Sequence, residues 1–157
     1  MQAHVIDHIT GEEDPIPRHI VKESARIARG NVKSLNELNV KDYDTLLVPG
    51  GFGAAKNLCT FAFKGVNMTV YDDVERVLRD FHSAKKVIGL TCISPIIAAK
   101  LFGSEGVRLT LGGSGENFPS AGSIDAALSF GAQMEEMDVN MVCTDWKNYI
   151  ITTPAYM

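Results

Sequence analysis

The sequence has no C-x-x-C pair, no long apolar run and no recognisable targeting signal, and each absence excludes a class of protein. Its three cysteines, Cys59, Cys92 and Cys143, lie far apart, which argues against a disulfide framework and for a reducing compartment. The four histidines do not cluster with the cysteines, so we expect no metal site. No stretch approaches the roughly 18 apolar residues of a membrane helix. The first residues, MQAHVIDHITGEED, have the features of neither a signal peptide nor a transit peptide.

Basic residues are also too few for a nucleic-acid partner. The formal charge is −4 and the isoelectric point is near 5.5, whereas nucleic-acid binding requires a basic face. A basic stripe at helical spacing runs from Arg18 to Lys33, but Glu12, Glu13 and Asp14 precede it. That mixture of signs favours a solvated helix face.

Short apolar runs alternate with amphipathic segments along the chain. Asp72 and Glu75 predict a capping box at the start of one helix, and Asp145-Trp146-Lys147-Asn148 is typical of a hairpin turn. The alternation predicts a single α/β domain over residues 1–157, built around a mainly parallel sheet. The expected helices span 18–29, 73–84, 95–102 and 123–132, and the expected strands span 45–48, 87–91, 107–111, 139–144 and 149–153.

The segment GLTCISP, residues 89–95, places a cysteine between a strand and a helix. Ser94 is a candidate N-cap, and Pro95 suits the first turn because its missing N–H would be unpaired there anyway. Cys92 therefore precedes a helix N-terminus, where the peptide dipoles favour a thiolate. This is the outline of a nucleophile elbow with cysteine in place of serine. A buried structural cysteine fits the local sequence equally well.

A second unusual segment, PGGFGAAKN, follows the expected strand over 45–48. In a parallel α/β sheet both segments lie at the C-terminal edge, where ligand sites form. Glycines let the backbone turn tightly, and the amides of Gly51 and Phe52 are candidates for an oxyanion hole beside Cys92. A phosphate-binding loop and a plain strand-to-helix turn are the alternatives, although neither of the usual phosphate-loop patterns is present. The predicted backbone site comprises Gly50, Gly51, Phe52, Gly53 and Ile93.

PGGFGAAKNL, GLTCISP and the final TTPAYM together resemble the PfpI/ThiJ (class I glutamine amidotransferase-like) superfamily. The closest resemblance is to its ElbB glyoxalase-like branch, which includes mitochondrial animal members, and it covers nearly the whole chain. The resemblance implies a flavodoxin-like, doubly wound sheet and a cofactor-free attack by Cys92 on small dicarbonyls such as glyoxal. It also implies a mitochondrial location, with the cytoplasm as the alternative, and it leaves a homo-oligomer open.

Two departures from the family pattern bear on activity. Protease-like members carry a histidine directly after the elbow cysteine, whereas this chain has Ile93. The family also supplies a glutamate from the turn after its first strand, and this chain begins about where the family's second strand is ending. We therefore expect a domain truncated at both ends, without its first strand and closing helix, and inactivity in this form is one interpretation. Glu116 is the one carboxylate in a site-facing loop, with ordinary loop solvation as its alternative role.

Two functional hypotheses follow from these residues. In the first, a Cys92 thiolate adds to an aldehyde, the loop amides stabilise the oxyanion, and a base moves a carbon-bound proton to give a hydroxy acid. The chain is then a glyoxalase III-like lyase without a cofactor. In the second, the missing glutamate and histidine leave a redox-sensing thiol or a non-catalytic metabolite pocket. Turnover of a dicarbonyl distinguishes the two.

Overall fold

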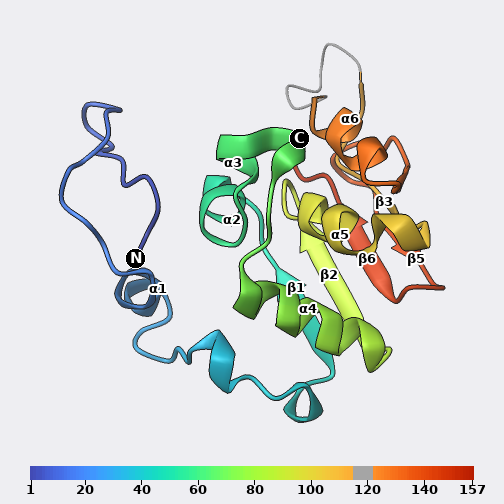
Figure 1. Ribbon diagram of the computed structural model, residues 1–157, viewed down its shortest axis with the longest axis horizontal. Helices are drawn as coiled ribbons and strands as arrows, with labels where there is room; N and C mark the ends of the chain where they lie inside the picture. The colour runs from blue at the N-terminus through green and yellow to red at the C-terminus, as the bar shows by residue number, and fades with distance from the viewer. Residues whose placement is uncertain (115–121) are drawn as a thin grey trace. The chain divides into compact units, whose positions relative to one another are not determined.

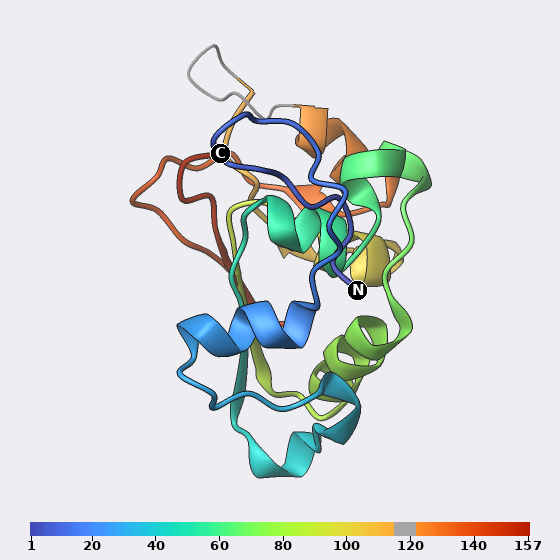
Figure 2. The ribbon, with the colours of Figure 1, turned by 90° about the vertical axis from the view of Figure 1, so that its left-hand side faces the viewer.

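The computed structural model describes residues 1–114 and 122–157, and it divides into two compact units, Met1–Leu38 and Asn39–Met157. The smaller unit is a loop closed by an antiparallel bridge, followed by α1 (Ile20–Ile27) and the short helix η1 (Leu35–Glu37) (Figure 2). α1 lies within the helix predicted over 18–29. Gly30 ends that stretch with a φ of 84°, which glycine adopts without steric cost. The assignment of 1–157 to a single domain stays a prediction.

Four strands form the main sheet of the larger unit, in the order β1-β2-β6-β5. β1, β2 and β6 are parallel, and β5 runs antiparallel to β6 because a hairpin joins the two. The predicted strands over 45–48 and 87–91 and the predicted hairpin turn are confirmed, and so is the mixed α/β class with a mainly parallel sheet. The strand predicted over 139–144 forms only at its C-terminal end. The strands are β1 (Thr45–Val48), β2 (Val87–Thr91), β5 (Cys143–Asp145) and β6 (Ile150–Thr153).

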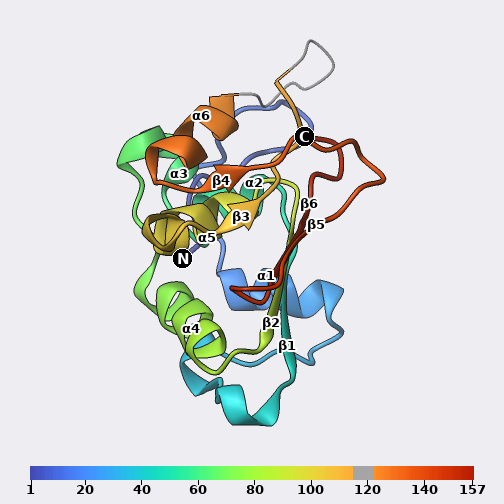
Figure 3. The same ribbon diagram turned by 90° about the vertical axis from the view of Figure 1, so that its right-hand side faces the viewer.

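The two faces of this sheet differ in burial. α4 (Asp72–Ser83) and α5 (Pro95–Phe102) lie on the same side of β1 and β2 (Figure 1, Figure 3). The side chains of Ile88, Leu90 and Ile150 are almost completely buried. The opposite face carries a row that crosses three strands, Leu47, Gly89 and Ile151, and Leu47 is 73% exposed at the edge strand β1. Whether a first strand and a closing helix are missing, as the resemblance implies, stays a prediction.

The strand predicted over 107–111 is much shorter than expected. Only β3 (Arg108–Leu109) forms, and it pairs with β4 (Gln133–Met134) in a separate two-stranded parallel sheet. Directly after β3, the N–H of Thr110 donates to the Thr152 hydroxyl and not to a strand partner. The strand prediction over 107–111 is therefore wrong in its length.

The predicted capping box at the start of α4 is also wrong. Asp72 is the first residue of the helix, and the cap position is Tyr71, which makes no side-chain capping bond. Glu75 instead accepts from the Arg79 side chain at 2.7 Å, one helical turn further on. That pair is half exposed and contributes little to stability.

No helix among the described residues has the length and apolar character that spanning a membrane requires.

The predicted helices agree with the structure in most of their bounds. The helix predicted over 95–102 is confirmed as α5, and the one predicted over 123–132 contains most of α6. The other elements of the larger unit are η2 (Val40–Asp42), α2 (Phe52–Asn57), α3 (Phe61–Lys64), η3 (Gly65–Asn67), η4 (Gly103–Glu105) and α6 (Gly122–Ser129).

Candidate active site

Cys92 lies directly after β2, in the turn that leads to α5, as the sequence predicts. Its φ is 58°, in the left-handed region that residues other than glycine rarely adopt. Its backbone N–H donates to the carbonyl oxygen of Thr153 at 3.0 Å, so the end of β6 holds the turn. Backbone strain of this kind persists only where the surroundings impose it, and it clusters at functional sites.

The buried side chain of Ser94 also stabilises this turn. Its side chain is fully buried, and its hydroxyl accepts from the N–H of Thr91 at 2.9 Å and lies 2.7 Å from the carbonyl oxygen of Val48. Because Val48 ends β1 and Thr91 ends β2, one hydroxyl ties the two strand ends together. Ser94 does occupy the predicted N-cap position of α5, but its side chain makes no capping bond, and Pro95 occupies the first turn as predicted.

Gly50 brings the glycine-rich segment against Cys92. A Cβ on Gly50 would lie 2.5 Å from the Cβ of Cys92 and 2.5 Å from the carbonyl oxygen of Thr91, so no side chain fits there. Gly51 follows with a φ of 87° and is the N-cap residue of α2. The N–H groups of Gly51, Phe52 and Gly53 have no hydrogen-bond acceptor among the residues that the structure describes. Donors in this state are available to a bound oxygen.

Cys92 lines a pocket with a volume of about 360 Å³, within the range of small-molecule sites. The lining is mostly apolar, and the thiol of Cys92 and the hydroxyl of Ser123 are its polar side-chain groups. Phe61, Ala62 and Ser123 gave no signal in the sequence, because α3 and α6 reach the pocket only through tertiary packing. The lining residues are Gly51, Phe52, Ala55, Phe61, Ala62, Cys92, Ile93, Ser123 and Met157.

No carboxylate or imidazole side chain is among these lining residues. His82 is on α4, where its ring stacks on Phe102 with the ring centroids 4.3 Å apart. Glu116 lies outside the described residues. Within the described part of the chain, no group of three or more histidine, cysteine, aspartate or glutamate side chains is placed to hold a metal ion. The chemistry that this pocket offers is a thiol nucleophile beside backbone N–H donors.

The other two cysteines are buried in the core. Cys59 and Cys143 are 0% and 2% exposed, whereas Cys92 is only partly buried. Burial raises the pKa of the Cys59 thiol, and burial together with the nearby Glu135 carboxylate raises the pKa of the Cys143 thiol. Cys92 is therefore the accessible thiol of the three.

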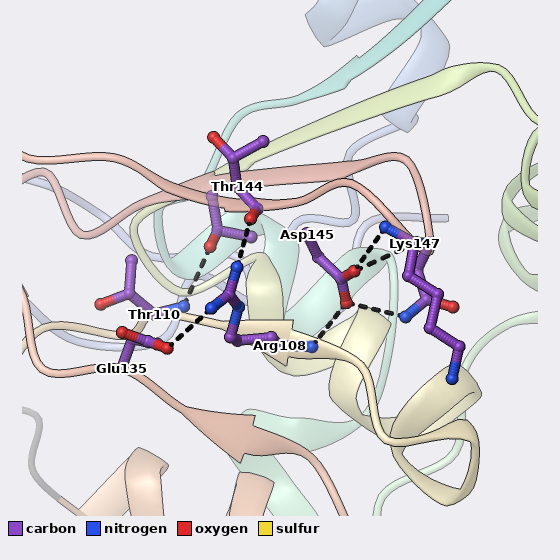
Figure 4. A network of polar contacts seen from close by, with 8 residues as sticks. Arg108, Thr110, Glu135, Thr144, Asp145 and Lys147 are labelled. Atoms are coloured by element: carbon purple, nitrogen blue, oxygen red, sulfur yellow. Dashed lines mark hydrogen bonds and ion pairs between the residues drawn. The ribbon is translucent and has the colours of Figure 1, made fainter.

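A second polar region lies at the other end of β6, around the buried side chain of Asp145 (Figure 4). Its carboxylate accepts from the N–H of Arg108 at 2.8 Å, from the side-chain amide of Asn148 at 2.7 Å, and from the N–H groups of Lys147 and Asn148. Burial alone would raise the pKa of Asp145, but these hydrogen bonds outweigh it and lower the pKa.

The side chain of Arg108 extends this network. It donates to the carbonyl oxygen of Thr144 at 2.9 Å and to the carboxylate of Glu135 at 3.3 Å (Figure 4). These contacts tie the β5–β6 hairpin to β3. The sequence indicated a hairpin turn here and no network, because Arg108 is 37 residues from Asp145 along the chain.

Comparison with known proteins connects the whole chain to one family, although no family model matches it. The rat ES1 protein homolog, mitochondrial, is 46% identical over 160 aligned positions, which cover 99% of this chain and 59% of the relative. The human glutamine amidotransferase-like class 1 domain-containing protein 3, mitochondrial, is 45% identical with the same coverage. The chain thus spans about three-fifths of the length of these relatives.

A solved structure agrees with the sequence relatives. The crystal structure of an isoprenoid biosynthesis protein with amidotransferase-like domain from Ehrlichia chaffeensis superposes with a TM-score of 0.82 and 31% identity. The match covers 98% of this chain and 67% of that one. The α/β architecture with its mainly parallel sheet therefore matches an amidotransferase-like, flavodoxin-type fold.

Proposed function

The chain belongs to the class I glutamine amidotransferase-like family, and we propose that it is a cofactor-independent, glyoxalase-like enzyme that uses Cys92 as its nucleophile. The names of the relatives give a family and no dicarbonyl reaction. The observation that carries the proposal is the left-handed backbone of Cys92, held between a strand and a helix at a pocket. A left-handed residue on a sharp strand-to-helix turn, with its side chain at a pocket, is the geometry of a nucleophile elbow.

The proposed reaction converts an α-oxoaldehyde and water to a 2-hydroxy acid. The Cys92 thiolate adds to the aldehyde carbon, and the new oxyanion accepts hydrogen bonds from the N–H groups of Gly51 and Phe52. The proton on the aldehyde carbon then moves to the neighbouring carbon, whose carbonyl becomes a hydroxyl. This leaves a thioester, which water hydrolyses to release the acid and the thiol. One carbon is oxidised and its neighbour is reduced, so the reaction needs no redox cofactor.

The proton transfer is the demanding step in this chain. The described lining residues offer no carboxylate or imidazole side chain, so we assign the transfer to water in the pocket. Water is a weaker base near neutral pH than a positioned side chain, and a positioned base contributes roughly 10²- to 10⁴-fold. We therefore expect slow turnover.

The same lack of a base in the described lining favours a second function, a non-catalytic thiol that senses oxidants or binds metabolites. Cys92 would then be oxidised to a sulfenic acid by peroxide and restored by a thiol, with no turnover of dicarbonyls. Its partial exposure suits this role as well. The two functions share the nucleophile and differ in whether product forms.

We also propose a mitochondrial location for this chain and a small dicarbonyl as its substrate. The location is supported by family resemblance, because the rat and human relatives are both named as mitochondrial. The substrate is supported by the pairing of an accessible thiol with free backbone donors.

Lactate formation from methylglyoxal by the purified chain tests the enzyme. We expect slow lactate formation that is lost in Cys92→Ser, because the serine hydroxyl is not ionised near neutral pH. Cys143→Ser is the matched control, since it changes a buried cysteine and should keep the activity. Rapid oxidation of Cys92 without any lactate would support the sensing function and contradict the enzyme.

A further inference from the structure

We infer that the Cys92 pocket selects α-oxoaldehydes that carry a bulky apolar substituent, of about the size of a phenyl ring, over glyoxal and methylglyoxal. This inference rests on the proposed function and names its substrate class. It narrows the small dicarbonyl of that proposal to one whose substituent the shape and chemistry of the pocket fit.

The first support is the volume of the pocket. At about 360 Å³, it falls within the range of roughly 300 to 1,000 Å³ that holds drug-sized ligands. Glyoxal has four non-hydrogen atoms and methylglyoxal has five, so either would leave most of the pocket filled with water. A phenyl substituent would displace that water from apolar walls, which is favourable.

The second support is the chemistry of the lining. Phe52, Phe61 and Ile93 are large apolar side chains, and Ala55 and Ala62 leave space beside them. A small dicarbonyl is polar at both carbons and gains little from such walls. The polar groups, which are the thiol, the Ser123 hydroxyl and the loop N–H groups, suffice to hold one reacting carbonyl pair.

The third support is the exposure of Phe52. Phe52 is 80% exposed, and among the described residues the Lys56 ammonium lies 5.4 Å from the centroid of its ring. A phenylalanine this exposed adds nothing to the core. Beside a nucleophile it offers an apolar surface that a substrate ring can cover, and ring pairs of this kind are favourable beyond their buried area.

The expected discrimination follows from pocket energetics. One methylene group in an apolar pocket changes specificity by roughly 10- to 200-fold. Phenylglyoxal differs from methylglyoxal by a whole ring, so we expect its kcat/KM to be at least about 10-fold higher, chiefly through a lower KM. Its product is mandelate, where methylglyoxal gives lactate.

The experiment compares kcat/KM for phenylglyoxal and methylglyoxal in the full chain and in three variants. Phenylglyoxal also modifies arginine, so the readout is the formation of mandelate or lactate. In Phe52→Ala and Phe61→Ala we expect the phenyl-to-methyl ratio to fall about tenfold. Phe63→Ala is the matched control, because Phe63 is exposed on the same short helix as Phe61 and lies outside the pocket lining. It should keep the ratio.

The outcomes separate the two proposals. A ratio near one in the unmodified chain, or a ratio that Phe52→Ala and Phe61→Ala leave unchanged, would overturn the selectivity. Because Phe52 is mostly exposed, its variant should fold even if Phe61→Ala does not. If neither substrate is turned over, the proposed enzymatic function is wrong, and the selectivity of the pocket is then tested by measuring binding. Tighter binding of mandelate than of lactate to the unmodified chain then supports it, and equal binding overturns it.

Discussion

Cys92 lies beside the last residue of β6, and Asp145 pairs with its first residue. The surroundings of these two residues differ in how many of their polar groups have a hydrogen-bond partner. Around Asp145, both carboxylate oxygens accept hydrogen bonds, and Arg108, Lys147 and Asn148 supply the donors. Around Cys92, the thiol faces apolar side chains, and the N–H groups of Gly51 and Phe52 have no described acceptor. A network in which every polar group has a hydrogen-bond partner rigidifies a fold. N–H donors without an acceptor beside a nucleophile are instead available to a ligand. The difference separates a structural region from a candidate site.

The largest effect should come from removing the carboxylate of Asp145. Asp145→Ala removes the acceptor of four N–H donors, two of them on the buried Asn148, and each donor left both buried and unpaired costs roughly 1–3 kcal/mol. We expect the free energy of unfolding to fall by about 2–5 kcal/mol, as measured by urea denaturation. Asp145→Asn keeps one acceptor oxygen and should cost less. Equal stability of the alanine variant and the native chain would show that the network does not hold the hairpin.

Thiol labelling should separate Cys92 from the two core cysteines. Iodoacetamide reacts with accessible thiolates, and burial of Cys59 and Cys143 both blocks access and raises the pKa of their thiols. We expect Cys92 to be labelled at least about 100-fold faster at neutral pH, as followed by peptide mass spectrometry, because labelling of the core thiols requires unfolding. In denaturant all three should react alike. Similar rates in the native chain would favour a structural Cys92.

A side chain at Gly50 should disturb the site and the fold together. Gly50→Ala places a methyl group 2.5 Å from the Cβ of Cys92 and from the Thr91 carbonyl oxygen, and neither atom is the end of a flexible side chain. We expect a loss of about 1–3 kcal/mol in the free energy of unfolding. Gly53→Ala is the control for stability, since nothing lies within 4 Å of a Cβ there. Equal melting temperatures of the two variants would contradict this close approach.

At position 92, glycine should give a more stable chain than alanine. Glycine adopts a φ of 58° without the steric cost that other residues bear, which is about 1–2 kcal/mol. We therefore expect Cys92→Gly to be more stable than Cys92→Ala by about 1 kcal/mol, measured by thermal unfolding. Alanine is the proper reference because both variants lose the thiol. A less stable glycine variant would mean that the turn is not strained at this residue.

Acid should weaken the Asp145 region before it affects the Cys92 pocket. The hydrogen bonds lower the folded-state pKa of Asp145 below its ordinary value of 3.8. This group therefore contributes stability that is fully present above pH 3.8 and is lost as the pH falls through the folded pKa. The slope of unfolding free energy against pH in that range should be smaller in Asp145→Asn. An unchanged slope would assign the acid sensitivity to other carboxylates.

Local patterns in the sequence predicted the elements near the site well. The apolar runs TLLV and VIGLT give β1 and β2 with their observed bounds, and the Pro95 position gives the start of α5. These features depend on neighbouring residues only. The position of Cys92 beside Gly50 was also predicted, because parallel strands end at a common edge. The catalytic role of Cys92 stays a prediction.

Features that depend on distant residues were predicted poorly. The hydroxyl of Ser94 bonds to Val48, 46 residues away, and so it ties strands instead of capping a helix. Phe61 and Ser123 join the pocket from helices whose packing has no local signature. The strand expected over 107–111 shortens because a side chain of β6 takes the N–H of Thr110. Tertiary contacts outweigh local propensity at each of these positions.

The buried hydroxyl of Ser94 has a consequence for local unfolding. Since it bonds to the ends of both β1 and β2, the turn that carries Cys92 cannot open without breaking hydrogen bonds to both strand ends. The amide hydrogens of Thr91 and Cys92 should then exchange with solvent deuterium only through near-global unfolding. The amide hydrogens of Gly51 and Phe52, a short distance away, should exchange within the native state. One pocket would then combine two exchange rates: slow exchange at the amide of the nucleophile Cys92, and fast exchange at the amide donors of Gly51 and Phe52.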